Sequence, residues 1–245
     1  NSYINRVYEL MESDGTRFIG KFYRPGRWSR EAIEEEHRFT IQCAEADIPV
    51  VPPVVLPNGS TLGETDDGIL FAVFPKRRGR EWEPVDDDAW QRLGTLVGRV
   101  HAVGAMESAP ARTVLHPAES AADSIGELLD GDIVSSKHRA EFAEFAQAAQ
   151  RALDEAFEGF DPHDFLRIHG DCHQGNILHR PDEGLVVIDF DDMATGPAVQ
   201  DLWMLLPDKV EHCRREINVM LEGYEMFCEF DDAELRLVEP LRLMR

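Results

Sequence analysis

The sequence predicts an α+β fold of two lobes, in which a small β-rich lobe is followed by a larger helical one. Before Pro75, short runs of aromatic and β-branched residues indicate strands. After Pro75, apolar residues recur at three- and four-residue spacing, which is typical of amphipathic helices. The chain has 245 residues, 43% of them hydrophobic and 29% charged, as expected for a folded protein of one large or two small domains.

The first lobe is expected at residues 1–75. Asp14-Gly15 is a turn sequence between two strand-like runs, so these runs should pair as a β-hairpin. Ser29 is a suitable N-cap for the helix that follows, because its hydroxyl can accept a hydrogen bond from a backbone N–H of the first turn. The predicted elements are strands at 3–10, 17–23 and 69–74, and a helix from Ser29 to about Ala46.

The second lobe is expected at residues 76–245 and is predicted to be mainly helical. Trp90, Leu93 and Val97 illustrate the helical spacing of its apolar residues. The predicted helices cover 86–103, 142–156, 203–206, 213–228 and 233–244, and two short apolar segments at 165–168 and 185–188 flank a polar loop. The chain begins with Asn and stops inside a predicted helix, so we expect a truncated C-terminus.

The charge of the chain argues against some classes of partner. Its 47 acidic and 25 basic residues give a net charge of −22, whereas binding nucleic acid or an anionic membrane requires clustered Lys and Arg. We interpret the one basic run, residues 76–80, as a solvated loop. Four widely spaced cysteines predict neither a disulfide framework nor a zinc site, and no apolar stretch is long enough for a membrane span. We expect a cytoplasmic monomer.

The strongest local signal is the segment His169-Gly170-Asp171-Cys172-His173-Gln174-Gly175-Asn176, which matches H-x-D-x-x-x-x-N, the spacing of a kinase catalytic loop. Phosphoryl transfer needs a carboxylate that accepts the proton of the attacking hydroxyl, and Asp171 has that place. It also needs neutral oxygen ligands for Mg²⁺ near the phosphates, which Asn176 can supply. The alternative interpretation is a polar turn between buried strands.

A second acidic signal follows thirteen residues after Asn176. Asp189-Phe190-Asp191-Asp192 comes directly after an apolar run, so Asp189 is placed where the second metal ligand of a kinase belongs. The third position is Asp191 rather than Gly, which departs from the protein-kinase form. Three carboxylates so close together repel one another unless a cation lies between them, which favours a metal site over a solvated turn.

The cation for the nucleotide phosphates is predicted to be Lys21. Residues 15–21 match G-x-x-x-x-G-K, but Phe22 replaces the Ser or Thr of a P-loop, and Pro25 and Gly26 follow where its helix should begin. A lysine on a strand, ahead of a helix that carries carboxylates, matches the kinase arrangement instead. Among the acidic residues of that helix we choose Glu36 as the partner of Lys21.

With Lys21, Glu36, Asp171, Asn176 and Asp189 in this order, the chain resembles the aminoglycoside phosphotransferase and choline kinase superfamily, and within it the bacterial stress response kinase A family. The segments that carry the resemblance are 1–8, 21–25, 35–37, 71–75, 169–178 and 196–204. It implies a bilobal protein-kinase-like fold and a cytosolic enzyme that uses ATP and Mg²⁺. It also implies phosphate transfer to Ser and Thr residues of proteins, including the enzyme itself.

The resemblance also assigns roles to single residues. It makes Asp171 the proton acceptor and gives Mg²⁺ to Asn176 and Asp189. Ser2 would lie in the loop that covers the nucleotide. The backbone from Ala72 to Phe74 would offer hydrogen bonds to adenine, and Asp201 would be a buried acceptor that ties down the catalytic loop.

Two other functions remain open at this stage. The acidic excess is compatible with a small-molecule kinase of the aminoglycoside, choline or homoserine type, because relatives of that kind bind cationic substrates with carboxylates. Alternatively, His101, His169, Cys172, His173 and the nearby aspartates can be interpreted as the metal site of a phosphohydrolase, which leaves Lys21 and Glu36 unexplained. Oxidation of Cys172, next to Asp171, is a further regulatory hypothesis.

Overall fold

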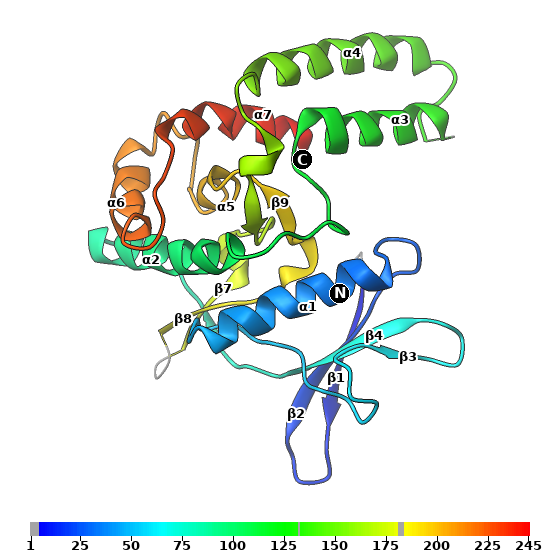
Figure 1. The fold of residues 1–245 in the computed structure, drawn as a ribbon, viewed down its shortest axis with the longest axis vertical. Coiled ribbons are helices and arrows are strands. Elements are labelled where there is room, and N and C mark those ends of the chain that lie inside the picture. Colours follow the sequence, from blue (N-terminus) through cyan, green and yellow to red (C-terminus); the bar gives the residue numbers. More distant parts are fainter. Residues whose placement is uncertain (1–4, 132, 181–183) are drawn as a thin grey trace.

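The structure is a computed structural model that describes residues 5–131, 133–180 and 184–245 (Figure 1). It has the predicted α+β architecture of two lobes. In Figure 1 the sheet of the N-lobe lies at the bottom, and the helices of the C-lobe lie above it. The division that we propose at residue 75 coincides with the end of a strand.

The N-lobe is a four-stranded antiparallel sheet with one helix. The strand order is β1-β2-β4-β3, so β1 and β3 are the edges. The hairpin of β1 and β2 is confirmed, and its turn places Gly15 at φ 89°, a conformation that favours glycine. The elements are β1 (Arg6–Met11), β2 (Arg17–Phe22), α1 (Arg30–Glu45), β3 (Gly63–Glu64) and β4 (Leu70–Pro75).

Helix α1 begins and ends where the sequence predicts. The Ser29 hydroxyl accepts a hydrogen bond from the backbone N–H of Ala32 at 3.1 Å, as an N-cap does. The buried face of the helix includes Ile33 and Phe39, and the helix lies between the sheet and the C-lobe in Figure 1. Ile33 of α1 packs in one cluster with Ala72 of β4, and α1 also contacts the C-lobe, so its polar residues can reach the space between the lobes.

The C-lobe is built on a close contact between two helices. Its helices are α2 (Asp87–Gly104), α3 (Ala122–Asp130), α4 (Arg139–Ala156), α5 (Val199–Trp203), α6 (Arg214–Tyr224) and α7 (Val238–Met244). A Cβ atom at Gly94 would lie 1.7 Å from the carbonyl oxygen of Met220, and one at Gly223 would lie 2.0 Å from that of Gln91. Glycine is therefore required where α2 crosses α6.

Short strands complete the C-lobe and carry its polar loops. They form a three-stranded sheet in the order β5-β7-β8 and a two-stranded sheet of β6 and β9. Their bounds are β5 (Arg80–Glu81), β6 (Leu166–Ile168), β7 (Ile177–Arg180), β8 (Gly184–Val187) and β9 (Ala194–Gly196). The predicted helix at 233–244 is divided into a 3₁₀ segment, Asp232–Leu237, and α7. In the part of the chain that is described, no helix is long and apolar enough to cross a membrane.

His37 connects α1 to the residue after β2 and to the loop before β3 through one buried and one partly buried hydrogen bond. Its Nε2 lies 2.9 Å from the Tyr23 hydroxyl and its Nδ1 lies 2.8 Å from Thr61 Oγ1. Burial, assisted by the nearby Lys21 charge, lowers the pKa of His37 to about 4 from an ordinary value of 6.5. The folded protein therefore holds this imidazole neutral.

We expect His37 to make the protein less stable in mild acid. Between pH 6.5 and about 4 the unfolded chain binds a proton that the folded chain does not. The free energy of unfolding therefore decreases by up to about 3 kcal/mol as the pH is lowered through this interval. Urea unfolding at several pH values checks this. The variant His37→Gln should lose less stability over this interval, whereas a variant of the exposed His163, His163→Gln, should behave like the natural protein. Parallel pH profiles for all three proteins would contradict the assignment.

Alanine should have opposite effects at a glycine inside the contact of α2 with α6 and at a glycine outside it. Gly94→Ala should lower the free energy of unfolding by about 3 kcal/mol, because the added methyl group meets backbone that cannot move aside. The matched control is Gly126→Ala in α3, where nothing lies within 4 Å of the new Cβ and the helix should gain up to about 1 kcal/mol. Urea unfolding measures both, and equal losses would refute the close contact.

Candidate active site

Two cavities meet at the boundary between the lobes. The first has a volume of about 390 Å³ and is lined from the N-lobe by Lys21, Glu36 and Phe74 and from the C-lobe by Asp189. The second has a volume of about 350 Å³ and lies on the C-lobe side. Asp171 and Asp192 line both cavities. A group bound in the first cavity can therefore reach a group bound in the second across these two aspartates.

A β-hairpin explains why Asn176 and Asp189 come together. Asn176 directly precedes β7, and one residue separates Asp189 from the end of β8; the two strands pair with Ile177 opposite Val187. The ladder extends to a hydrogen bond of 3.0 Å from Ile188 N–H to the carbonyl oxygen of Asn176. Residues thirteen positions apart in the sequence are thus neighbours at one end of a hairpin.

Lys21 is held by three carboxylates at the wall of the first cavity. Its Nζ lies 2.9 Å from Asp191 Oδ1, 3.1 Å from Asp189 Oδ1 and 3.7 Å from Glu36 Oε1. Burial alone lowers the pKa of Lys21, but these carboxylates outweigh it and raise the pKa above its ordinary value. The predicted partner Glu36 is present. However, Asp191, which sequence reasoning did not assign to Lys21, makes the shorter contact.

Glu36 is nearly inaccessible to solvent. Burial raises the pKa of its carboxyl group, although the Lys21 charge acts in the opposite direction. Within the described residues, Glu36 Oε2 has no hydrogen-bond partner, whereas Oε1 faces Lys21. Removal of Lys21 would leave the buried Glu36 carboxyl group without its ion-pair partner, so the two side chains depend on each other.

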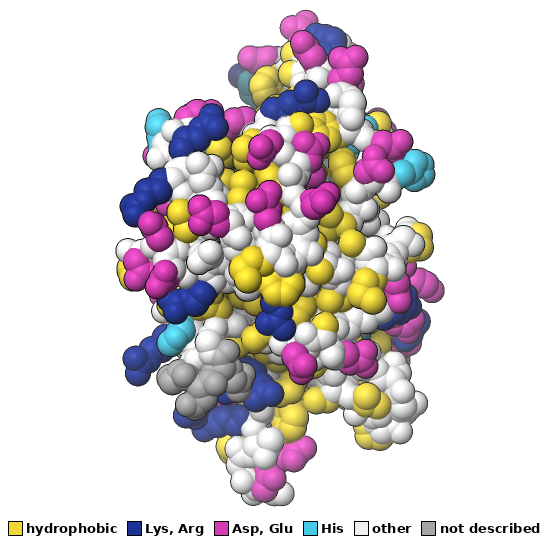
Figure 2. All heavy atoms as spheres, turned by 60° about the vertical axis from the view of Figure 1, so that its left-hand side comes forward, with side chains coloured by type: hydrophobic (Ala, Val, Ile, Leu, Met, Phe, Trp, Pro, Cys, Tyr) yellow, Lys and Arg dark blue, Asp and Glu magenta, His cyan; other side chains and the backbone are white. Residues whose placement is uncertain are grey.

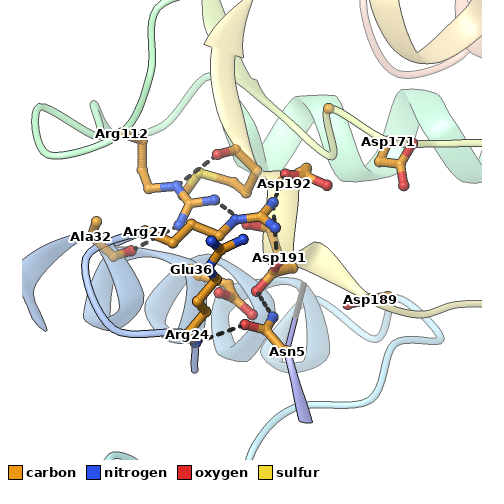
Figure 3. Close-up of polar contacts among 12 residues, drawn as sticks. Asn5, Arg24, Arg27, Ala32, Glu36, Arg112, Asp171, Asp189, Asp191 and Asp192 are labelled. Carbon is orange, nitrogen blue, oxygen red and sulfur yellow. Dashed lines mark hydrogen bonds and ion pairs between the residues drawn. The ribbon is translucent and has the colours of Figure 1, made fainter. Parts of the chain in front are cut away.

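The cations beside Asp191 and Asp192 are side chains of the N-lobe. Arg27 Nη2 contacts Asp192 Oδ1 and lies 3.4 Å from Asp191 Oδ2, while Asn5 Nδ2 donates to Asp191 Oδ1 at 2.9 Å (Figure 3). Repulsion among the aspartates suggested a metal ion at this point. Since Lys21 and Arg27 neutralise these two carboxylates, no metal ion is needed to hold them together.

Asp189 and Asn176 have the chemistry of a hard-cation site. Asp189 has a left-handed backbone, with φ 62°, which is rare for a residue other than glycine and is often found at functional sites. Burial would raise the pKa of its carboxyl group, but the Lys21 charge prevails and lowers it, so the group is ionised. The Asn176 amide donates through Nδ2 to the carbonyl oxygen of Asp171 at 2.9 Å, which leaves Oδ1 as an oxygen ligand. These two oxygen donors fit Mg²⁺ or Ca²⁺.

Asp171 lies in the loop before β7, where its backbone is fixed from two sides. Its carbonyl oxygen accepts the Asn176 hydrogen bond, and its N–H donates to His169 Nδ1 at 3.3 Å. The carboxylate is partly exposed, contacts the Arg245 guanidinium and lies 3.5 Å from His173 Nε2. It faces both cavities, as a proton acceptor for a hydroxyl in the second cavity must.

The predicted role of Asp201 as an anchor of the catalytic loop is confirmed. Its carboxylate accepts hydrogen bonds from the N–H groups of His169 at 2.7 Å and Gly170 at 2.8 Å, and it lies 2.9 Å from His101 Nε2. Burial would raise the pKa of Asp201, but these donors keep the pKa below its ordinary value. Gly170 has φ 81°, and a Cβ there would lie 2.0 Å from the carbonyl oxygen of Asp192.

Three other predicted residues have different outcomes. Ser2 lies outside the described residues. Phe74 lines the first cavity, next to Pro75 and Arg77. Ala72 is fully buried opposite Lys21 in the ladder of β2 and β4 and is not among the described residues that line this cavity. The last two residues of β4, Phe74 and Pro75, therefore form this edge of the first cavity.

The basic run at residues 76–80 is not simply a solvated loop. Lys76 forms an ion pair with Glu9 of β1, and Arg77 lines the first cavity. Sequence reasoning missed Arg77 because a short cluster of basic residues is usually solvated. Its position three residues after the predicted strand at 69–74 is the signal that points to the cavity.

Cys172 and the histidines do not form a metal site. Cys172 is buried, and burial raises the pKa of its thiol well above the ordinary value, so the thiol is neutral and the redox hypothesis loses its basis. His101 is engaged with Tyr224 and Asp201, and His169 Nε2 with the carbonyl oxygen of Ile188. In the described part of the chain, no three His, Cys, Asp or Glu residues are grouped to hold a metal ion. The phosphohydrolase interpretation therefore finds no support among the described residues.

Comparison with curated proteins identifies the family. Residues 1–238 match the phosphotransferase enzyme family. The chain is 42% identical over 251 residues to stress response kinase A of Escherichia coli K12, and 40% identical over 248 residues to a protein of Salmonella typhimurium named serine/threonine protein kinase RdoA. In both cases the match covers the whole of this chain and 73% of the relative.

Comparison with solved structures agrees with the fold. An amicoumacin kinase determined with AMP-PNP, Ca²⁺ and amicoumacin superposes with a TM-score of 0.77 at 22% identity, covering all of this chain and 76% of that one. A spectinomycin phosphotransferase superposes with a TM-score of 0.65 at 15% identity, covering 99% of this chain and 77% of that one. Both support the two-lobed kinase-like fold. The chain thus belongs to the phosphotransferase enzyme family, is a homologue of stress response kinase A, and is a kinase.

Proposed function

We propose that the protein is an ATP- and Mg²⁺-dependent protein kinase that transfers the γ-phosphoryl group to Ser or Thr hydroxyls, its own included. One observation carries this proposal: Lys21, Asn176 and Asp189 converge near a cavity whose wall includes Asp171, and Asp171 also faces a second cavity. The first cavity suits a nucleotide and the second an acceptor. The name serine/threonine protein kinase, carried by a relative at 40% identity, supports the class of acceptor.

In this proposal the first cavity binds ATP. Lys21 holds the α- and β-phosphates, and Glu36 and Asp191 orient it. Asn176 and Asp189 bind the divalent metal, which supplies positive charge to the phosphates when bound. The adenine ring lies against Phe74 and the strand end that follows it. The covering role of Ser2 and the backbone hydrogen bonds from Ala72 remain predictions.

Asp171 performs the proton chemistry in the proposed reaction. An acceptor hydroxyl in the second cavity donates its proton to the Asp171 carboxylate as its oxygen attacks the γ-phosphorus. The backbone hydrogen bonds of Asp171 and the Asp201 anchor keep this carboxylate in place before the acceptor binds. Fixed geometry matters in this reaction, because positioning and charge neutralisation provide most of the catalysis.

A small-molecule kinase is the second candidate, and the solved neighbours that act on small substrates favour it. The acceptor cavity argues against a polycationic substrate, since its two carboxylates are already paired, Asp171 with Arg245 and Asp192 with Arg27. The acidic excess does not gather at one site on the face shown in Figure 2, where carboxylates and basic side chains are interspersed. A neutral hydroxyl, such as that of Ser or Thr, fits this cavity better.

Incubation with labelled ATP and Mg²⁺ distinguishes the two candidates. We expect label on Ser or Thr residues of the protein itself and of added protein mixtures. Label that appears only on an added aminoglycoside, amino alcohol or homoserine would instead establish the small-molecule kinase. A cytoplasmic location and a monomeric state remain part of the proposal and are tested by cell fractionation and by light scattering.

The variant Asp171→Asn should lower kcat for phosphate transfer by about 10²- to 10⁴-fold, because it removes the proton acceptor and keeps the shape of the side chain. Its affinity for Mg-ATP should stay within a few-fold of the natural protein. Initial rates with labelled ATP measure the effect. The control Glu141→Gln removes a carboxylate from the exposed surface of α4 and should leave kcat unchanged. Turnover near the natural rate in Asp171→Asn would remove Asp171 from its role.

The variant Asp189→Asn should change the dependence on metal rather than the proton transfer. Loss of the anionic ligand should raise the Mg²⁺ concentration needed for half-maximal nucleotide binding by at least about tenfold. Titration of the protein with Mg²⁺ at a fixed ATP concentration measures this. An unchanged Mg²⁺ requirement would show that Asp189 serves only as the partner of Lys21.

A further inference from the structure

Arg27 occupies the border between the two lobes and belongs to neither the predicted nucleotide site nor the predicted metal site (Figure 3). It lies in the loop between β2 and α1. Its Nη2 contacts Asp192 and lies 3.4 Å from Asp191 Oδ2, while Lys21 contacts the other oxygen of Asp191 at 2.9 Å. Two cations only six residues apart in the sequence thus share one buried carboxylate.

The fold determines where Arg27 lies. The preceding Gly26 has φ 81°, a conformation that turns the chain and favours glycine. The following Trp28 has the buried Arg112 guanidinium 3.8 Å from its ring centre. Arg112 in turn donates to the carbonyl oxygens of Asp191 and Met193. The loop is therefore fixed to the backbone of the same segment whose carboxylates Arg27 contacts.

The two cations face different cavities. Lys21 lines the nucleotide cavity and Arg27 lines the acceptor cavity, while Asp171 and Asp192 line both. Among the described residues, the carboxylate contacts of Arg27 are made by Nη2. To residues of the described ranges, its Nε and Nη1 groups make no hydrogen bond, so they are available as donors. A guanidinium with free donors next to a shared wall can contact a group that passes from one cavity to the other.

We propose that Arg27 is a catalytic residue that binds the phosphoryl group during its transfer, from the acceptor side. This rests on the proposed kinase function. In the reaction the acceptor oxygen bonds to the γ-phosphorus while the bond from that phosphorus to the β,γ-bridging oxygen breaks. The acceptor proton moves to Asp171, and ADP leaves with the bonding electron pair. Arg27 neutralises the negative charge on the oxygens of the transferred group from the acceptor side, whereas Lys21 holds the α- and β-phosphates from the nucleotide side.

The experiment compares binding of Mg-ADP with binding of Mg-ADP plus aluminium fluoride, which mimics the phosphoryl group in transfer. The natural protein should bind the mimic more tightly than Mg-ADP. Arg27→Gln should lose most of this preference, while its affinity for Mg-ADP changes less than about threefold. Its kcat should fall by about 10³-fold, the order of magnitude known for arginines that stabilise a phosphoryl group in transfer. Arg27→Lys should recover part of the preference, because it restores charge but not the planar donor pair.

Two controls separate catalysis from a structural contact. Arg30→Gln, which removes an exposed ion pair with Glu64 in the first turn of α1, should leave both affinities and kcat unchanged. Lys21→Gln should weaken Mg-ADP and the mimic together. If Arg27→Gln weakens both in the same way and also lowers the melting temperature, Arg27 is only a contact between the lobes and the proposal is overturned.

The remaining outcomes test the role of Arg27 separately from the proposed class of acceptor. A natural protein that binds Mg-ADP and the mimic equally well overturns the role of Arg27. The same conclusion follows if Arg27→Gln keeps the full preference for the mimic. A natural protein that prefers the mimic through Arg27 but labels no protein substrate supports the role of Arg27 and refutes the proposed class of acceptor.

Discussion

The charge contact between the lobes is the constraint on which the site depends. Buried carboxylates are stable only when cations are close, and removing one partner of such a pair costs about 3–5 kcal/mol. Here the buried carboxylate of Asp191 belongs to the C-lobe, while its cationic partners Lys21 and Arg27 belong to the N-lobe. Lys21, Asp189 and Asp191 all line the first cavity, so the ion pairs that join the two lobes also shape this cavity.

A second set of contacts fixes the catalytic loop to the helical core. Asp201 binds the loop through the N–H groups of His169 and Gly170, and it is bound in turn by His101 of α2. Helix α2 packs against α6 at glycines that let the two backbones touch, and Tyr224 of α6 reaches the other nitrogen of His101. The position of Asp171 is therefore determined in part by packing far from the cavity.

Local sequence signals predicted the regular elements and the groups that lie near each other along the chain. The hairpin, the cap at Ser29, α2 and the catalytic loop follow from turn chemistry, capping and apolar periodicity, all of which act over a few residues. The strands β3 and β5 have two residues each and carry no such periodicity, so they were not predicted. Asn176 and Asp189 were placed together through a resemblance and a spacing, and the hairpin supplies the physical reason.

The rest of the site depends on contacts that are distant in sequence. Arg27 and Asp192 are 165 positions apart, and Lys21 and Asp189 are 168 apart. No local sequence pattern around any of these residues predicts such a distant ion pair. The extra aspartate at position 191 was recognised as a departure from kinase form, but only the structure shows that it accepts Lys21 on one oxygen and faces Arg27 on the other.

The shortness of the segment from Lys21 to Arg27 has a mechanical consequence. Lys21 lies near the end of β2 and Arg27 lies in the loop that follows. The buried Arg112 holds this loop in place by its contact with Trp28 and its hydrogen bonds to the C-lobe backbone. Because the two cations are only six positions apart in the sequence, the position of one charge limits where the other can lie.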